Sequence, residues 1–155
     1  MDGRTVFNAV GKLTRINAGA QLTKSILITG CSSGIGFDCA KTLQARGWQV
    51  FASCRDPDDC AQLESMGFDS PHLDHADEDT IRATFEYIQA KTGGTLDAVF
   101  NNGAFAVPGL IEDLPTDALR DIFETNFFGY HTVTRHVLPI MRAQGHGRIL
   151  QCSSA

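Results

Sequence analysis

The sequence has no excess of positive charge and no long apolar run. It carries 13 Lys and Arg against 18 Asp and Glu, a formal net charge of −5, and its basic residues do not cluster. Nucleic-acid-binding domains concentrate positive charge, so this balance argues against that class. No segment approaches the about 18 consecutive apolar residues that cross a membrane. The first residues also lack the apolar block of a secretion signal. The sequence therefore predicts a cytoplasmic protein that binds neither nucleic acid nor membrane.

Cysteine and histidine are present but lack the spacing of a disulfide framework or a metal site. The five cysteines include no C-x-x-C pair, and their number is odd. Because Cys is among the most buried residue types, we expect reduced thiols in or near the core. The five histidines are scattered and form no ligand pattern with carboxylates. These residues are Cys31, Cys39, Cys54, Cys60 and Cys152, and His72, His75, His131, His136 and His146. The sequence predicts no metal centre.

The chain fits one domain preceded by a short tail. Its 155 residues lie within the usual range of a single domain and suffice for a sizeable core. Residues 1–24 have weak periodicity and many small or polar side chains, which predicts a poorly ordered tail. The organised part begins at Ser25, and we expect the folded domain to span residues 25–155.

Strand and helix patterns alternate along this organised part. Short apolar runs rich in Val, Ile and Phe predict strands at residues 25–29, 48–53, 96–101 and 148–152. Apolar residues three and four positions apart predict helices at residues 35–46, 58–66, 77–91 and 116–143. Because the strands are apolar without interruption, both faces of their sheet are expected to be covered. The pattern predicts an α/β fold, a doubly wound parallel sheet.

A glycine-rich turn, TGCSSGIG, follows the first predicted strand and precedes the first predicted helix. Glycine reaches backbone conformations closed to other residues and lets the chain approach a phosphate closely. The helix that follows presents unpaired N–H groups and the positive end of its dipole, which favour an anion. The hydroxyls of Ser32 and Ser33 would add donors. At this position in a parallel sheet, the turn predicts a dinucleotide site.

Three further motifs follow the glycine turn in order. The glycines themselves, at 30, 34 and 36, are spaced G-x-x-x-G-x-G. The later motifs are NNGA (101–104), TNFFG (125–129) and GRILQCSSA (147–155). Together they resemble the short-chain dehydrogenase/reductase family, with its N-N-A-G loop, helix Asn and strand bearing the catalytic Ser. The resemblance implies a Rossmann fold and a homo-oligomeric oxidoreductase. It also implies hydride transfer between a nicotinamide cofactor and a small-molecule alcohol, aldehyde or ketone.

The resemblance also implies which residues would hold the cofactor. The glycine turn would wrap the pyrophosphate, and the loop of Asn101 and Gly103 would lie beneath the nicotinamide. Asp74 would lie near the adenine, or it would act only as the N-cap of the helix that follows. The order Gly103-Ala104 departs from the family's N-N-A-G but keeps two small residues beside the cofactor. The implied cofactor-binding residues are Thr29, Gly30, Ser32, Ser33, Gly34, Ile35, Gly36, Arg55, Asp74, Asn101 and Gly103.

The end of the second predicted strand bears on the choice between the two nicotinamide cofactors. NAD-binding sites place an acid about 20 residues after the glycine turn, whereas NADP-binding sites place a basic residue there. Here the sequence is FASCRDP, with no acid at the strand end and Arg55 directly after it. A guanidinium fork binds a phosphate through strong charge-assisted hydrogen bonds. The sequence favours NADP(H) over NAD, unless Arg55 is merely a solvated partner of Asp56 or Asp58.

Only some of the family's catalytic residues have counterparts in this sequence. Asn126 matches the family's helix Asn, although an Asn on an apolar stripe can also serve a structural role in a helix bend. Ser154 matches the catalytic Ser, with Ser153 as its competitor. The family's Tyr and Lys, spaced Y-x-x-x-K, belong to the helix after this Ser, where only Ala155 remains.

One Y-x-x-x-K does occur, from Tyr87 to Lys91, but it precedes the Ser strand and is not expected to be catalytic. We therefore expect the chain to hold the first five strands of the fold and to stop before the catalytic Tyr and Lys. On this interpretation the isolated chain is inactive. The alternative is a catalytically dead nucleotide-binding or regulatory module.

Overall fold

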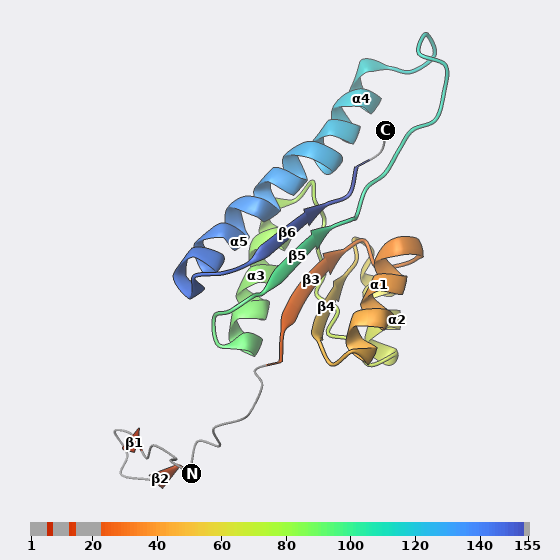
Figure 1. Cartoon of the computed structure of the whole chain (residues 1–155). Helices are drawn as coiled ribbons and strands as arrows, with labels where there is room; N and C mark the ends of the chain where they lie inside the picture. The colour runs from red at the N-terminus through yellow and green to blue at the C-terminus, as the bar shows by residue number, and fades with distance from the viewer. Residues whose placement is uncertain (1–5, 8–12, 15–22, 154–155) are drawn as a thin grey trace.

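The computed structural model describes residues 23–153 and, in the N-terminal part, residues 6–7 and 13–14 (Figure 1). In that N-terminal part, strand β1 (Val6–Phe7) pairs antiparallel with strand β2 (Leu13–Thr14). The poorly ordered tail expected for residues 1–24 otherwise falls on residues outside the described ones.

The centre of the fold is a four-stranded parallel sheet. Strand β3 (Ser25–Thr29) lies between β4 (Gln49–Ser53) and β5 (Ala98–Asn101), and β6 (Arg148–Gln151) pairs with β5. The strand order is β4-β3-β5-β6. Beside the β4 edge of this sheet, the structure has two isolated parallel bridges, Phe51 with Asp69 and Cys54 with His72.

Helices connect the strands, and local sequence sets their ends. They are α1 (Gly34–Ala45), α2 (Pro57–Ser65), α3 (Glu78–Thr92), α4 (Thr116–Phe123), the π-helix η1 (Glu124–Gly129) and α5 (Tyr130–Gln144). The carboxylates of Asp56 and Asp77 accept hydrogen bonds from backbone N–H groups in the first turns of α2 and α3 and so cap them. Among the described residues, no helix is both long and apolar enough to cross a membrane.

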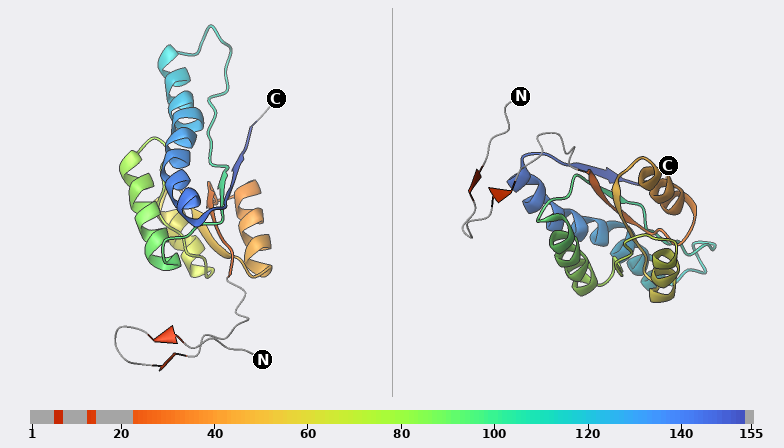
Figure 2. Two further views of the ribbon diagram at one scale, coloured as in Figure 1. Left: turned by 60° about the vertical axis from the view of Figure 1, so that its left-hand side comes forward. Right: turned by 90° about the horizontal axis from the view of Figure 1, so that it is seen from below.

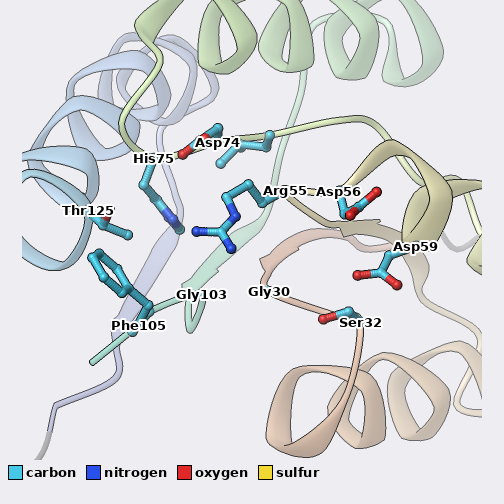
Figure 3. Close-up of a pocket in the computed structure, with 12 residues that line it drawn as sticks. Gly30, Ser32, Arg55, Asp56, Asp59, Asp74, His75, Gly103, Phe105 and Thr125 are labelled. Atoms are coloured by element: carbon cyan, nitrogen blue, oxygen red, sulfur yellow. The ribbon is translucent and has the colours of Figure 1, made fainter. Parts of the chain in front are cut away.

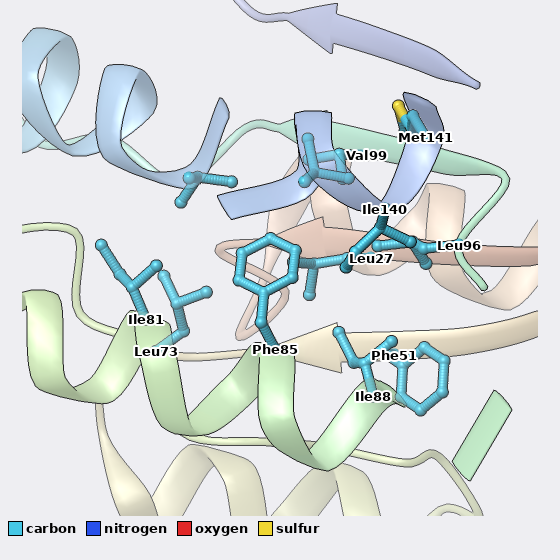
Figure 4. Packing of buried hydrophobic residues seen from close by; sticks show 12 residues of the cluster. Leu27, Phe51, Leu73, Ile81, Phe85, Ile88, Leu96, Val99, Ile140 and Met141 are labelled. Carbon is cyan, nitrogen blue, oxygen red and sulfur yellow. The ribbon is translucent and has the colours of Figure 1, made fainter. Parts of the chain in front are cut away.

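The two faces of the sheet bury two separate apolar clusters, because successive side chains of a strand point to opposite faces. Leu27 of β3 joins the cluster that α3 and α5 cover (Figure 4). Its neighbours Ile26 and Ile28 join the cluster that α1 and α2 cover. Figure 2 shows these helix pairs on either side of the sheet. This is the doubly wound Rossmann arrangement, which confirms the predicted fold class.

The helix predicted over residues 116–143 is present as one uninterrupted helical stretch of residues 116–144, made of α4, η1 and α5. The π-helix η1 forms the middle of this stretch, where the backbone turn is wider than in the α-helical parts on either side. The apolar stripe predicted for this helix is buried in α5, at residues such as Val133 and Val137. Leu119 of α4 is 55% exposed, and no residue of α4 is buried. Figure 1 shows the reason, since α4 extends beyond the edge of the sheet that α5 covers.

Candidate functional site

A pocket lies where the carboxyl ends of β3, β4 and β5 meet (Figure 3). In a doubly wound sheet this is the edge at which ligands bind. Loops from four separate parts of the chain contribute to it. The lining residues are Gly30, Ser32, Arg55, Asp56, Asp59, Leu73, Asp74, His75, Gly103, Ala104, Phe105 and Thr125.

The glycine turn forms one wall and requires its glycines. Gly30 has a φ of +69°, and a Cβ there would collide with the Cα of Gly103. A Cβ at Gly36 would likewise collide with the carbonyl oxygen of Gly30. At Gly34, by contrast, a Cβ would meet nothing within 4 Å, so this side of the turn is open. The turn therefore packs backbone against backbone at Gly30 and Gly36 and is open at Gly34.

Buried side chains join the glycine turn to the loop after β5. The hydroxyl of Thr29 accepts hydrogen bonds from the N–H groups of Asn102 (2.9 Å) and Gly103 (3.0 Å). The Asn102 amide in turn donates to the carbonyl oxygens of Thr29 and Gly30, each at 3.1 Å. Asn102 was missed by the sequence reasoning, although it is the second Asn of NNGA. These bonds hold the two loops as one unit.

At the end of β4, Arg55 is the first side chain that reaches the pocket. Ser53 is fully buried and its hydroxyl donates to the carbonyl oxygen of Ile28 (3.2 Å), and Cys54 is buried as well. The Arg55 side chain extends into the pocket in the direction of His75 (Figure 3). The site thus offers a cation where an NAD-binding site would offer an acid.

The alternative role of Arg55, an ion pair with a neighbouring aspartate, is not formed. Within residues 23–153, no carboxylate lies within 4.0 Å of its guanidinium. Asp56 instead accepts from the N–H of Asp58 (2.9 Å) as the cap of α2. His72 fixes the Arg55 backbone, because its Nε2 lies 2.8 Å from the Arg55 carbonyl oxygen.

Asp74 lines the same pocket, and the N-cap alternative for it is wrong. The cap of α3 is Asp77, whose carboxylate accepts from the N–H of Asp79 (2.9 Å). The carboxylate of Asp74 accepts from the N–H of Ala76 (2.9 Å), which closes a tight turn before the helix. This turn leaves Asp74 half-buried at the pocket wall.

His75 is the second residue that sequence reasoning missed. It is 7% exposed, lines the pocket, and its Nε2 has no hydrogen-bond partner in the described part of the chain. Burial lowers the pKa of His75 to about 4, although the nearby Asp74 carboxylate opposes this shift. The imidazole is therefore neutral at pH 7. The only sequence signal was its position directly after Asp74.

Comparison with known proteins matches this geometry. The family model for short chain dehydrogenases matches residues 24–155. The chain belongs to the short-chain dehydrogenase/reductase family. It is 38% identical over 143 residues to the uncharacterized oxidoreductase YbbO of Escherichia coli (strain K12), covering 92% of this chain and 53% of that protein.

Two further relatives agree. Retinol dehydrogenase 8 of Bos taurus is 32% identical over 145 residues, which cover 87% of this chain and 46% of that one. The crystal structure of a short-chain dehydrogenase from Streptomyces avermitilis superposes with a TM-score of 0.79 at 30% identity, covering 88% of this chain and 51% of that one. The chain thus spans about half the length of the curated relatives it matches.

Membership of the short-chain dehydrogenase/reductase family implies a nicotinamide dinucleotide cofactor, and the pocket fits one. The open side at Gly34, the unpaired N–H groups at the start of α1 and the Arg55 cation all suit phosphate oxygens. Of the residues expected to hold the cofactor, five line the pocket: Gly30, Ser32, Arg55, Asp74 and Gly103. Thr29, Gly36 and Asn101 lie buried behind it, and Ser33, Gly34 and Ile35 are exposed at the start of α1.

Of the residues expected at the reacting end, Asn126 is anchored to the same framework. The Asn126 amide, in η1, accepts from the N–H of Phe105 (3.1 Å) and donates to its carbonyl oxygen (2.9 Å). Asn101 donates from Nδ2 to Oε1 of Gln151 (2.9 Å), which ties β5 to β6. Ser153 is exposed just after β6, and Ser154 lies outside the described residues.

The Tyr87–Lys91 pair has a structural explanation. The Tyr87 hydroxyl donates to Asp69 (2.8 Å), and the Lys91 ammonium lies 3.1 Å from the same oxygen. Burial and the hydrogen bond to Asp69 raise the pKa of Tyr87, whereas a catalytic Tyr at neutral pH needs a lowered one. Neither residue lines the pocket.

Proposed function

We propose that this chain is the cofactor-binding part of an NADP(H)-dependent oxidoreductase that transfers hydride between the nicotinamide and a small-molecule alcohol, aldehyde or ketone. The observation that carries the cofactor preference is Arg55, which lines the pocket without a carboxylate partner in the described residues. A guanidinium at this point would bind the 2′-phosphate that distinguishes NADP from NAD. Strand β4 ends at Ser53 without an acid, and Asp56, which also lines the pocket, is engaged as the cap of α2.

The other residues take the roles that the family implies. Gly30, Ser32 and the start of α1 would bind the pyrophosphate through N–H and hydroxyl donors, and Asp74 would lie near the adenine. Ser154 would polarise the reacting carbonyl by hydrogen bonding. Asn126, through its bonds to Phe105, would hold the substrate-side loop in place. By the same resemblance, we propose a homo-oligomeric enzyme of the cytoplasm.

Turnover also needs a proton donor beside the reacting oxygen. The family's Tyr and Lys do not occur after Ser154 in this sequence, and the Tyr87–Lys91 pair is bound to Asp69 instead. We therefore propose that the 155-residue chain binds cofactor but does not turn over. NADPH oxidation by the pure 155-residue chain, above a heat-denatured control, would contradict this proposal.

The cofactor preference is tested by titrating NADPH and NADH into wild type and Arg55→Ala while following cofactor fluorescence. Hydrogen bonds to a charged group contribute about 1.5–3 kcal/mol, so NADPH affinity should fall roughly 10- to 150-fold while NADH affinity stays unchanged. Arg82→Ala is the matched control, because Arg82 is an exposed arginine of α3 outside the pocket and paired with Asp79. An unchanged ratio of the two affinities in Arg55→Ala would rule out the NADP assignment.

A further inference from the structure

The His75 imidazole is a buried polar group without a described partner at the wall of the candidate site. Its side chain points into the region between Asp74, Arg55 and Gly103 (Figure 3). Its Nε2 is enclosed and makes no hydrogen bond in the described part of the chain. Nearly all buried polar groups in folded proteins are hydrogen-bonded, and an unpaired one costs free energy. An apolar side chain at this position would avoid that cost in free energy. We therefore infer that the imidazole has a function here.

Two glycines leave room for His75, Gly103 beside its ring and Gly129 beside its Cβ and backbone. A Cβ at Gly103 would lie 3.0 Å from Cε1 of His75 and 3.0 Å from the Gly30 nitrogen. A Cβ at Gly129 would collide with Cβ of His75. The order Gly103-Ala104, reversed from the family's N-N-A-G, therefore keeps a methyl group out of the space beside the imidazole. Glycine at position 103, where the family has alanine, is thus compatible with the buried ring of His75.

The surroundings of the ring keep it neutral. Asp74 is the carboxylate that acts on it, and the ring of Tyr130 packs 5.2 Å away, centroid to centroid. Burial raises the pKa of Tyr130 to about 12, so that phenol is uncharged as well. A neutral imidazole carries one N–H donor and one acceptor nitrogen. Its terminal torsion is soft, so the ring can turn between its packed orientation and one facing a ligand.

We propose that His75 is a cofactor-binding residue whose Nε2 hydrogen-bonds directly to a hydroxyl or phosphate oxygen of the bound nicotinamide dinucleotide. This inference rests on the proposed function. The bound ligand supplies the partner that Nε2 lacks in the protein alone. His75 thus costs stability in the free chain and contributes affinity in the complex.

The test compares His75→Leu, His75→Asn and wild type in two measurements, the NADPH dissociation constant and the thermal midpoint of the cofactor-free chain. One hydrogen bond corresponds to roughly a 2- to 13-fold change in affinity. We expect His75→Leu to weaken NADPH binding by that factor while its midpoint equals or exceeds that of wild type. His75→Asn should recover part of the affinity. His136→Leu is the control, because His136 stacks on Phe85 outside the pocket and should leave affinity unchanged.

The outcomes separate the inference from the proposed function. If wild type binds neither NADPH nor NADH, the proposed function fails and the inference fails with it. If wild type binds and His75→Leu binds equally well, only the inference is overturned. Parallel losses of affinity and midpoint in His75→Leu, without recovery in His75→Asn, would assign His75 a structural role and also overturn it.

A second set of variants tests the link between the ring and the loop. Gly103→Ala should lower the thermal midpoint and NADPH affinity of wild type. In the background of His75→Ala, the same substitution should cost less, because Cε1 no longer limits the space at Gly103. If Gly103→Ala lowers the midpoint and the NADPH affinity equally in both backgrounds, the His75 ring does not determine which residue fits at position 103. This result would count against the inference.

Discussion

Replacing Thr29 by valine tests whether the Thr29 hydroxyl holds the two halves of the cofactor site together. Thr29 is fully buried, and its hydroxyl is the acceptor for the N–H groups of Asn102 and Gly103. Valine has nearly the same shape but no acceptor. The substitution therefore leaves both N–H groups without their partner while filling the same space.

The magnitude follows from these two bonds. A buried donor left unpaired costs about 1–3 kcal/mol. Asn102 and Gly103 are only half-buried, so each should cost near the lower end of that range. We expect Thr29→Val to lower the free energy of unfolding by about 2–3 kcal/mol. Thr29→Ser keeps the hydroxyl and loses one methyl group, which should cost about 1 kcal/mol.

Urea unfolding gives the measurement, followed through the fluorescence of Trp48, the single tryptophan of the chain. Trp48 packs at the edge of the cluster under α1 and α2, so its emission reports on loss of the core. NADPH affinity of Thr29→Val should fall as well, since the loop of Asn102 and Gly103 loses its anchor. If Thr29→Val were as stable as Thr29→Ser, the hydroxyl would not join the two loops and the reasoning would be refuted.

Three further outcomes are expected. Burial alone would raise the pKa of Asp97, but hydrogen bonds from the Ser25 backbone and His146 outweigh it and lower this pKa. A carboxylate with a lowered folded-state pKa stabilises the fold above about pH 4 and loses that contribution as the pH falls further. Asp97→Asn should therefore have a lower free energy of unfolding than wild type at pH 7, as measured by urea unfolding. This difference should shrink below about pH 4, and a difference that stays constant with pH would contradict the reasoning. Iodoacetamide at pH 8, followed by peptide mass spectrometry, should label the half-buried Cys39 and Cys152 well before the buried thiols Cys31, Cys54 and Cys60. Burial raises the pKa of Cys31 far above its usual range and that of Cys54 to about 12, so early labelling of either would contradict the burial. Gly36→Ala should abolish NADPH binding through the collision with the Gly30 carbonyl, and a variant that binds normally would show that the turn tolerates a Cβ.

The elements and their order were predictable because they depend on neighbours in the chain. The strand at 25–29 and the helix ending near Gly47 follow from apolar periodicity and from a glycine with φ of +83°. The glycine turn was equally predictable, since its spacing encodes steric limits that hold in any structure. The position of Arg55 shortly after the strand that ends at Ser53 also follows from the sequence.

Contacts between distant segments were not predictable. Whether Asp74 caps a helix depends on which of two nearby aspartates faces the first turn of α3, and the structure gives that role to Asp77. The π-helical conformation of η1 was not predictable either. The residues of α4, η1 and α5 form a single amphipathic pattern in the sequence, and that pattern does not indicate where the helix turn widens. In that element, the Asn126 amide binds the Phe105 backbone, 21 positions away in the chain.

The sequence by itself thus determined the order of strands and helices, the glycine turn and the cation that follows the second strand of the sheet. Only the tertiary structure decided that Thr29 and Asn102 join the two cofactor loops, that Arg55 has no carboxylate partner among the described residues, and that His75 is enclosed beside Gly103. The physical reason is the range of the interactions. Helix periodicity and glycine conformation act over a few residues, whereas burial and hydrogen-bond pairing depend on segments that meet only when the chain folds.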